Sequence, residues 1–142
     1  MKLMIRIPAE MIKLTEDRVI LRGEEGEAQV PISILDNKTI AQLIVSRIDV
    51  EGLRANREGL ISLSEASRRY GINEPLLSTW SLQGIVRRMG KKRWRGFGIV
   101  EVVESDVAIA AEIYKIAMDI TKSKIRAGMI LRHAIDILRD RN

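Results

Sequence analysis

The first third of the chain alternates apolar and polar residues, which is the pattern of strands that bury one face. The alternation covers residues 2–7 and 18–35 and is rich in β-branched side chains. A turn at residues 23–26, with a glycine at each end, divides the second stretch and predicts a β-hairpin. Because Pro31 has no N–H to donate to a strand ladder, we expect its strand to lie at an edge of the sheet.

A helix is expected directly after the hairpin. Asp36 or Asn37 can cap its N-terminus, and apolar residues then recur through residues 39–45, so that the helix ends near Ile48. Residues 49–60 are mixed and polar, and they predict a connector with a helical turn.

Helical periodicity dominates the chain after residue 106. Two series of apolar residues recur at spacings of three and four, namely Val107, Ala110, Ile113, Ala117 and Ile120, and then Ala127, Ile130, Leu131, Ala134, Ile135 and Leu138. They predict two amphipathic helices capped by Asp106 and Ser123, or one bent helix. These apolar faces must be buried against another surface. A homodimer would provide it, and so would folding back on the N-terminal hairpin and helix.

The centre of the chain predicts two short helices joined by a tight turn. In the first helix, Leu63, Ala66 and Tyr70 share one side, and Gly71 supplies the left-handed position that ends it. Ile72 packs inward. The second helix has features at successive positions: Asn73 as N-cap, Pro75 in the first turn, an apolar face of Leu76, Leu77 and Trp80, and Gly84 as its stop. We expect Leu63, Leu77, Trp80, Leu82 and Ile85 to be core residues. Two helices joined in this way predict a helix-turn-helix.

The order of these residues resembles a known family of DNA-binding domains. Glu65-Ala66, Gly71-Ile72-Asn73, Leu77, Trp80, Gly84 and Ile85 stand without a gap at the spacings of the winged helix-turn-helix of the MerR/excisionase type. In that family a two-stranded wing and an acidic helix start follow, here residues 86–103 and 104–107. The resemblance covers about a third of the chain. It implies binding to double-stranded DNA, and dimerisation through the helix after the wing.

Charge is distributed unevenly along the chain. The net charge is −1 over residues 1–60, +4 over residues 61–104 and +2 over residues 105–142, within a total of +5. Residues 86–95 contain six basic residues and no acidic one: Arg87, Arg88, Lys91, Lys92, Arg93 and Arg95. Such a cluster is typical of a surface that binds polyphosphate, and a solvated charged loop is the alternative.

Candidate DNA contacts fall on the second helix and on the wing. Ser78, Thr79 and Gln83 can hydrogen-bond phosphates or base edges. The wing candidates are Arg87, Arg88, Lys91, Lys92, Arg93, Trp94 and Arg95. The family often places arginine early in the second helix, but this chain has Glu74 and Pro75 there, so we expect the wing to supply most of the affinity. Trp94 and Phe97 either pack the wing or contact the partner.

Several other classes of protein are disfavoured. The chain is 46% hydrophobic and 30% charged, a globular balance, and no apolar run approaches the roughly 18 residues that span a bilayer. The N-terminus becomes polar too soon for a signal peptide, and the chain has no cysteine for a disulfide or a thiolate zinc site, which fits a cytoplasmic protein. No cofactor or membrane partner is expected.

No convincing catalytic or metal constellation is visible, so we do not expect an enzyme. His133 and Asp136 have the spacing of an acid–base pair, but a surface or packing histidine is favoured. Glu24, Glu25 and Glu27 are expected to form a solvated turn. Residues 5–10 faintly resemble swapped-hairpin DNA-binding antitoxins, although the glycine-aspartate step of that group is missing.

The sequence therefore predicts an α+β protein with three regions. They are an N-terminal β-hairpin with a helix (1–58), a central winged helix-turn-helix (59–106) and a C-terminal helical pair (107–142) that dimerises or folds back. The leading hypothesis is a transcription regulator or an excisionase-like architectural factor. The alternatives are a small, phage-encoded factor that docks on the transcription machinery, or a DNA-binding subunit of a recombinase or packaging enzyme.

Overall fold

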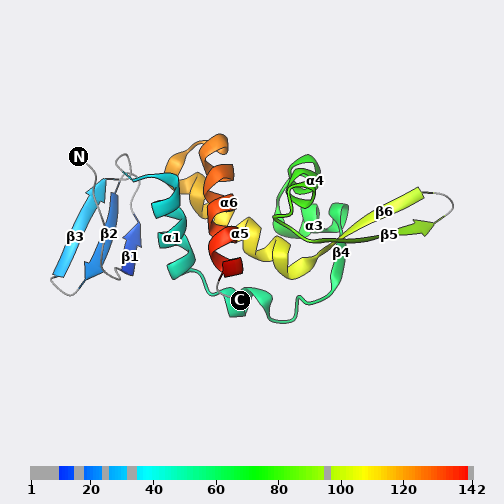
Figure 1. The fold of residues 1–142 in the computed structure, drawn as a ribbon, viewed down its shortest axis with the longest axis horizontal. Helices are drawn as coiled ribbons and strands as arrows, with labels where there is room; N and C mark the ends of the chain where they lie inside the picture. Colours follow the sequence, from blue (N-terminus) through cyan, green and yellow to red (C-terminus); the bar gives the residue numbers. More distant parts are fainter. Residues whose placement is uncertain (1–9, 15–17, 24–25, 32–34, 95–96, 141–142) are drawn as a thin grey trace. The chain divides into compact units, whose positions relative to one another are not determined.

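The computed structural model describes residues 10–14, 18–23, 26–31, 35–94 and 97–140 and has an α+β fold, as predicted (Figure 1). It divides into two compact units. Unit 1 combines residues 1–48 with residues 113–142, and unit 2 comprises residues 49–112. Helix α5 (Glu104–Thr121) belongs to unit 2 by its first half and to unit 1 by its second half.

Unit 1 begins with an antiparallel sheet in the order β1-β2-β3. Its strands are β1 (Glu10–Leu14), β2 (Arg18–Gly23) and β3 (Gly26–Pro31). Strands β2 and β3 pair as a hairpin, with Gly23 opposite Gly26, and Pro31 lies in an edge strand of the described sheet. Strand β1 was not predicted, and residues 2–7 lie outside the described part of the chain.

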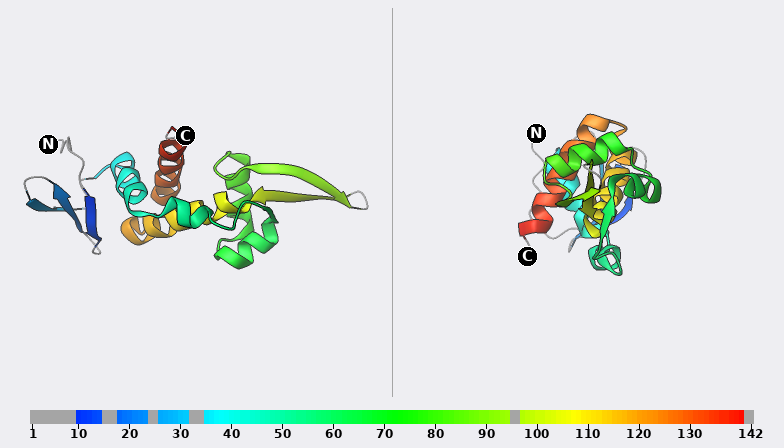
Figure 2. Two further views of the ribbon diagram at one scale, coloured as in Figure 1. Left: turned by 90° about the horizontal axis from the view of Figure 1, so that it is seen from below. Right: turned by 90° about the vertical axis from the view of Figure 1, so that its right-hand side faces the viewer.

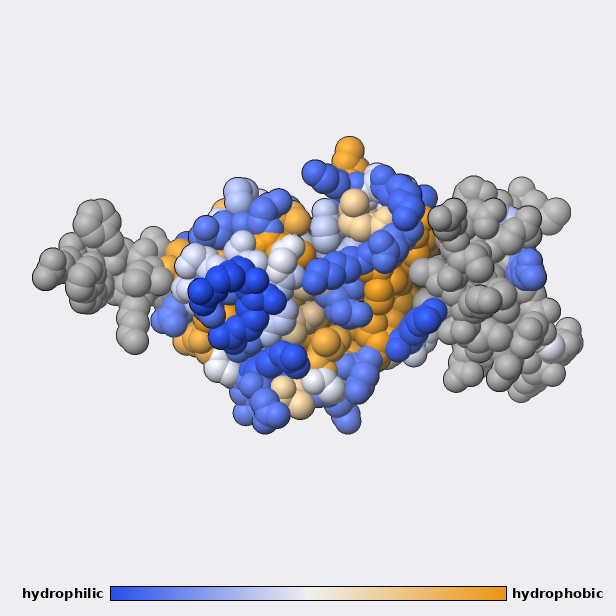
Figure 3. Space-filling model, turned by 180° about the vertical axis from the view of Figure 1, so that it is seen from behind, coloured by the Kyte–Doolittle hydropathy of each residue, from blue (hydrophilic) through white to orange (hydrophobic). Residues whose placement is uncertain are grey.

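The helices of unit 1 pack on each other within the chain. Helix α1 (Asn37–Arg47) begins after Asp36, whose carboxylate accepts from the Thr39 N–H at 2.7 Å, as expected for an N-cap. Helix α6 (Lys124–Asp140) packs along α1, and the Arg126 side chain donates to the Asn37 amide oxygen at 2.9 Å. Helix α1 also contacts β1, and a hydrophobic strip is visible at its position in Figure 3.

The C-terminal segment forms two separate helices, with a break where the sequence predicts it. Lys122 has a left-handed backbone (φ 55°) after α5, and the Ser123 hydroxyl accepts from the Arg126 N–H at 3.2 Å at the start of α6. The prediction that Asp106 caps α5 is wrong. The helix starts at Glu104, directly after the preceding strand, so Asp106 lies inside its first turn and accepts from Arg87 instead.

The apolar series that suggested a dimer is buried inside the chain. Ile113, Ala117 and Ile120 of α5 are buried, and so are all six apolar residues predicted for α6. The packing of α6 on α1 is the fold-back arrangement predicted as the alternative. Ile125 and Met129, which are 78% and 53% exposed, remain uncovered large apolar residues on α6.

Unit 2 combines short helices with a second antiparallel sheet. Its elements are α2 (Val50–Arg54), β4 (Leu60–Ser62), α3 (Leu63–Tyr70), α4 (Glu74–Leu82), β5 (Arg88–Trp94) and β6 (Phe97–Val103). The strand order is β4-β6-β5. The helical turn in the connector and the two-stranded hairpin were predicted. Strand β4 was not, because three residues are too few for a periodic pattern.

The turn between α3 and α4 forms as its residues predict. Gly71 adopts the left-handed conformation at φ 68° and ends α3. The Asn73 side chain then accepts from the Leu76 N–H at 2.9 Å, and Pro75 lies in the first turn of α4. Two helices of eight and nine residues are thereby held by their own caps and one turn.

The core of unit 2 centres on α4. Trp80 is 2% exposed, and Leu77, Ala66 and Ile85 are buried as expected. Leu63 is half-buried, and Leu82, predicted as core, is 71% exposed. The reason is rotation along the helix, because two residues beyond Trp80 a side chain has turned by about 200°. Leu82 therefore faces away from the core that Trp80 enters.

Among the described residues, no helix is both long and apolar enough to cross a membrane.

The burial of Trp80 predicts a structural role. Trp80→Ala should lower the free energy of unfolding by about 3–5 kcal/mol, because it leaves a large cavity in a small core. Thermal or urea unfolding measures the effect. Leu82→Ala on the same helix is the matched control and should change stability little. A Trp80→Ala protein of unchanged stability that has lost only binding would contradict this role.

A homodimer stays a prediction, now limited to a smaller surface. If the chain dimerises through α6, Ile125→Glu combined with Met129→Glu should convert the dimer to a monomer without unfolding it, since both side chains are exposed. Sedimentation at micromolar concentration distinguishes the 16.1 kDa monomer from a species of twice that mass. A single monomeric species in the unmodified chain would refute the dimer.

Candidate nucleic-acid interface

Of the site residues predicted on the second helix, Ser78 and Thr79 lie on α4 and Gln83 is its C-cap residue. Thr79 and Gln83 are exposed, whereas Ser78 is half-buried. The Thr79 hydroxyl donates to the Pro75 carbonyl at 3.0 Å, so its proton is engaged within the helix. The Gln83 amide side chain makes no hydrogen bond to the described residues, and it is free to bind a ligand. Gln83 is thus the one of these three residues that is best placed for a partner.

The hairpin of β5 and β6 carries the predicted basic cluster. The two strands form a ribbon that extends beyond α3 and α4 in both Figure 1 and Figure 2. Its register pairs Lys91 with Val100, Lys92 with Ile99, Arg93 with Gly98 and Trp94 with Phe97. Arg95 lies outside the described residues. The backbone thereby places three predicted cationic residues consecutively on β5, and the role of Trp94 and Phe97 stays a prediction.

Arg87 and Arg88 lie at the base of this hairpin and differ in their surroundings. The Asp106 carboxylate accepts from the Arg87 backbone N–H and from its Nε, both at 2.9 Å, and from a terminal guanidinium nitrogen at 3.2 Å. This hydrogen-bonded pairing raises the pKa of Arg87. Arg88 is exposed and makes no ion pair with the described residues. Arg87 therefore anchors the hairpin to α5, while Arg88 is available to a partner.

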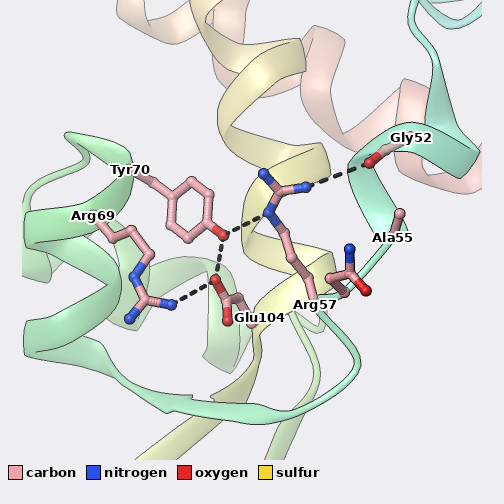
Figure 4. A pocket seen from close by; sticks show the side chains of 7 residues that line it. Gly52, Ala55, Arg57, Arg69, Tyr70 and Glu104 are labelled. Atoms are coloured by element: carbon pink, nitrogen blue, oxygen red, sulfur yellow. Dashed lines mark hydrogen bonds and ion pairs between the residues drawn. The ribbon is translucent and has the colours of Figure 1, made fainter.

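Figure 4 shows a polar network that the sequence did not predict and that includes side chains of α3. The Arg57 Nε donates to the Tyr70 hydroxyl at 3.1 Å, and that hydroxyl donates to Glu104 at 2.5 Å. A guanidinium nitrogen of Arg69 donates to the same Glu104 oxygen at 2.8 Å. These side chains come from the connector, from α3 and from the start of α5. Partners separated by 13 and 34 residues leave no periodic signal in the sequence.

The network borders an open depression of about 580 Å³, which Gly52, Ala55 and Asn56 complete. The hydrogen bond from Tyr70, followed by the contact with Arg69, lowers the pKa of Glu104. Burial first, and then the bond to Glu104, raises the pKa of Tyr70. The carboxylate is therefore held ionised and the phenol neutral. With each polar group already paired, this arrangement ties three segments of unit 2 together.

The remaining candidates gain no support as a site. His133 and Asp136 are both exposed on α6. Across the described residues, no group of three or more His, Cys, Asp or Glu side chains has a metal-binding arrangement. Glu24 and Glu25 lie outside the described part of the chain.

Comparison of the chain with models of protein families, with curated proteins and with solved structures found no match.

The pKa of Glu104 predicts an acid-dependent loss of stability. A carboxyl group whose pKa is lower in the folded state stabilises the fold above its unfolded value, here 4.5, and this contribution is lost as the pH falls through the folded pKa. Urea unfolding between pH 7 and pH 2.5 should therefore show a steeper decline for the unmodified chain than for Glu104→Gln. Glu112→Gln, at an exposed position of the same helix, is the control. If the free energy of unfolding falls equally with decreasing pH in all three chains, the network contributes nothing to this pH dependence.

Proposed function

We propose that residues 59–106 form a winged helix-turn-helix of the MerR/excisionase type that binds double-stranded DNA. In this assignment α3, the turn at Gly71 and α4 form the helix-turn-helix, α4 is the recognition helix, and the β5–β6 hairpin is the wing. The biological role is that of a cytoplasmic transcription regulator or an excisionase-like architectural factor.

The observation that carries the proposal is the basic cluster on the hairpin. Six cationic residues lie within residues 87–95, four of them in strand β5. A two-stranded ribbon of this charge suits the phosphate backbone or the minor groove of a duplex, where each neutralised phosphate releases counterions. The exposed face of α4 belongs to the same compact unit.

The proposal assigns different roles in DNA binding to α4 and to the wing. Helix α4 contains no lysine or arginine and carries Glu74 at its N-terminus, so it gains little from phosphate charge. The wing has the charge but presents its residues on an extended ribbon. Affinity that is largely independent of sequence is therefore assigned to the wing, and sequence preference to α4.

A second candidate function is docking on a protein of the transcription machinery. Leu82 and Met89, which are 71% and 52% exposed, favour it because exposed apolar side chains are common in protein interfaces. The two functions differ in their salt dependence. Phosphate neutralisation gives a steep log–log slope for binding to random duplex DNA, and docking on a protein does not require one.

The wing should dominate affinity for every duplex. Replacing Lys91, Lys92 and Arg93 by alanine should weaken binding to random-sequence DNA and flatten the salt slope by up to about three units, since each phosphate contact contributes about 0.9. Fluorescence anisotropy over a range of salt concentrations measures both effects.

The matched control replaces Lys115, Lys124 and Arg132 by alanine. These residues are exposed on α5 and α6, and their replacement removes the same number of positive charges. If both triple variants bind equally, the effect comes from net charge alone. Unchanged affinity after removal of the three wing residues would refute the wing as the contact surface.

A further inference from the structure

Four residues of α4 are exposed, and the only charged one among them is the acidic Glu74, which is unusual for a surface assigned to a polyanion. Pro75, Thr79 and Leu82 are exposed and stand at positions i, i+4 and i+7, so they form one line along the helix. The Thr79 hydroxyl is bonded to the Pro75 carbonyl, which leaves its methyl group as the part without a hydrogen-bonding role. Leu82 extends the line with a side chain that is 71% exposed.

The polar groups next to this line restrict which bases it can recognise. Guanine is most often bound by arginine or lysine, and α4 has neither. Gln83, beside Leu82, has an amide that makes no hydrogen bond to the described residues and is of the kind that binds the N6 and N7 atoms of adenine. An apolar surface in the major groove matches the C5-methyl group of thymine. The Gln83 amide favours adenine and the apolar line favours thymine, so both favour an A·T base pair.

We infer that α4 recognises A·T base pairs in the major groove, with Leu82 and Thr79 against thymine methyl groups and the Gln83 amide on adenine. The inference rests on the proposed function and adds the chemical class of its target. The line from Pro75 to Leu82 spans about 10 Å at the helical rise of roughly 1.5 Å per residue, which suits a groove about 12 Å wide. A single exposed leucine is common on protein surfaces. Leu82 differs from such a leucine because it is aligned with Pro75 and Thr79 on a helix that has no cationic residue.

Uracil tests the inference directly, because it pairs as thymine does and lacks only the C5-methyl group. A random-sequence duplex pool is selected on the intact chain, and the retained pool is then amplified with either dTTP or dUTP. Phosphates and minor-groove base edges are the same in both products. We expect the retained pool to be rich in A·T pairs, and the uracil form to bind about fourfold more weakly for each methyl group that α4 no longer covers.

Two leucine variants assign the effect to α4. Leu82→Ala should bind both forms of the pool with nearly the affinity that the unmodified chain has for the uracil form. Leu60→Ala, at a 47% exposed leucine on β4, is the matched control and should keep the full preference for thymine. Thermal unfolding checks that both variants fold.

The outcomes separate the inference from the proposed function. Equal binding of the thymine and uracil pools, with a steep salt slope, overturns the inference and leaves DNA binding by the wing intact. A preference for thymine that persists in Leu82→Ala overturns the role of this side chain. Absence of salt-dependent binding to any duplex overturns the inference and the proposed function together.

Discussion

Trp80 lies where α4, the turn after it and the base of the hairpin meet. Its side chain is 2% exposed, and its carbonyl oxygen accepts the N–H groups of both Ile85 and Val86, at 2.9 and 3.3 Å. The indole thus fixes the rotation of α4, while the carbonyl turns the chain back toward β5. Both constraints act at one residue, so the exposed face of the helix and the start of the hairpin are determined together.

The start of α5 holds the other elements of unit 2 to this core. Glu104 accepts hydrogen bonds from Tyr70 and Arg69 of α3, and Asp106 accepts from Arg87 at the base of the hairpin. The resemblance to the MerR/excisionase type singled out this acidic segment as a helix start. Helix α5 does start in this segment, at Glu104, and the carboxylates of Glu104 and Asp106 also connect α5 to two different elements.

The proposed interface follows from what these contacts leave exposed. Burial of Trp80 directs Leu82 to solvent. Arg87 is paired with Asp106, whereas Arg88 is exposed and makes no ion pair with the described residues. The surface proposed to bind DNA therefore has two parts of different chemistry. One is a charged ribbon suited to phosphates, and the other is an apolar helix face suited to base edges in the major groove.

The sequence by itself determined the local structure. Asp36, Gly71 and Asn73 act within a few residues of themselves, through a cap or a left-handed turn, so their effect can be derived without knowing the fold. The tertiary structure alone decided the partner of Asp106, the existence of β4 and the packing of α6 on α1. Each of these depends on which distant segment covers a residue, and helical periodicity shows that an apolar face needs cover without showing what supplies it.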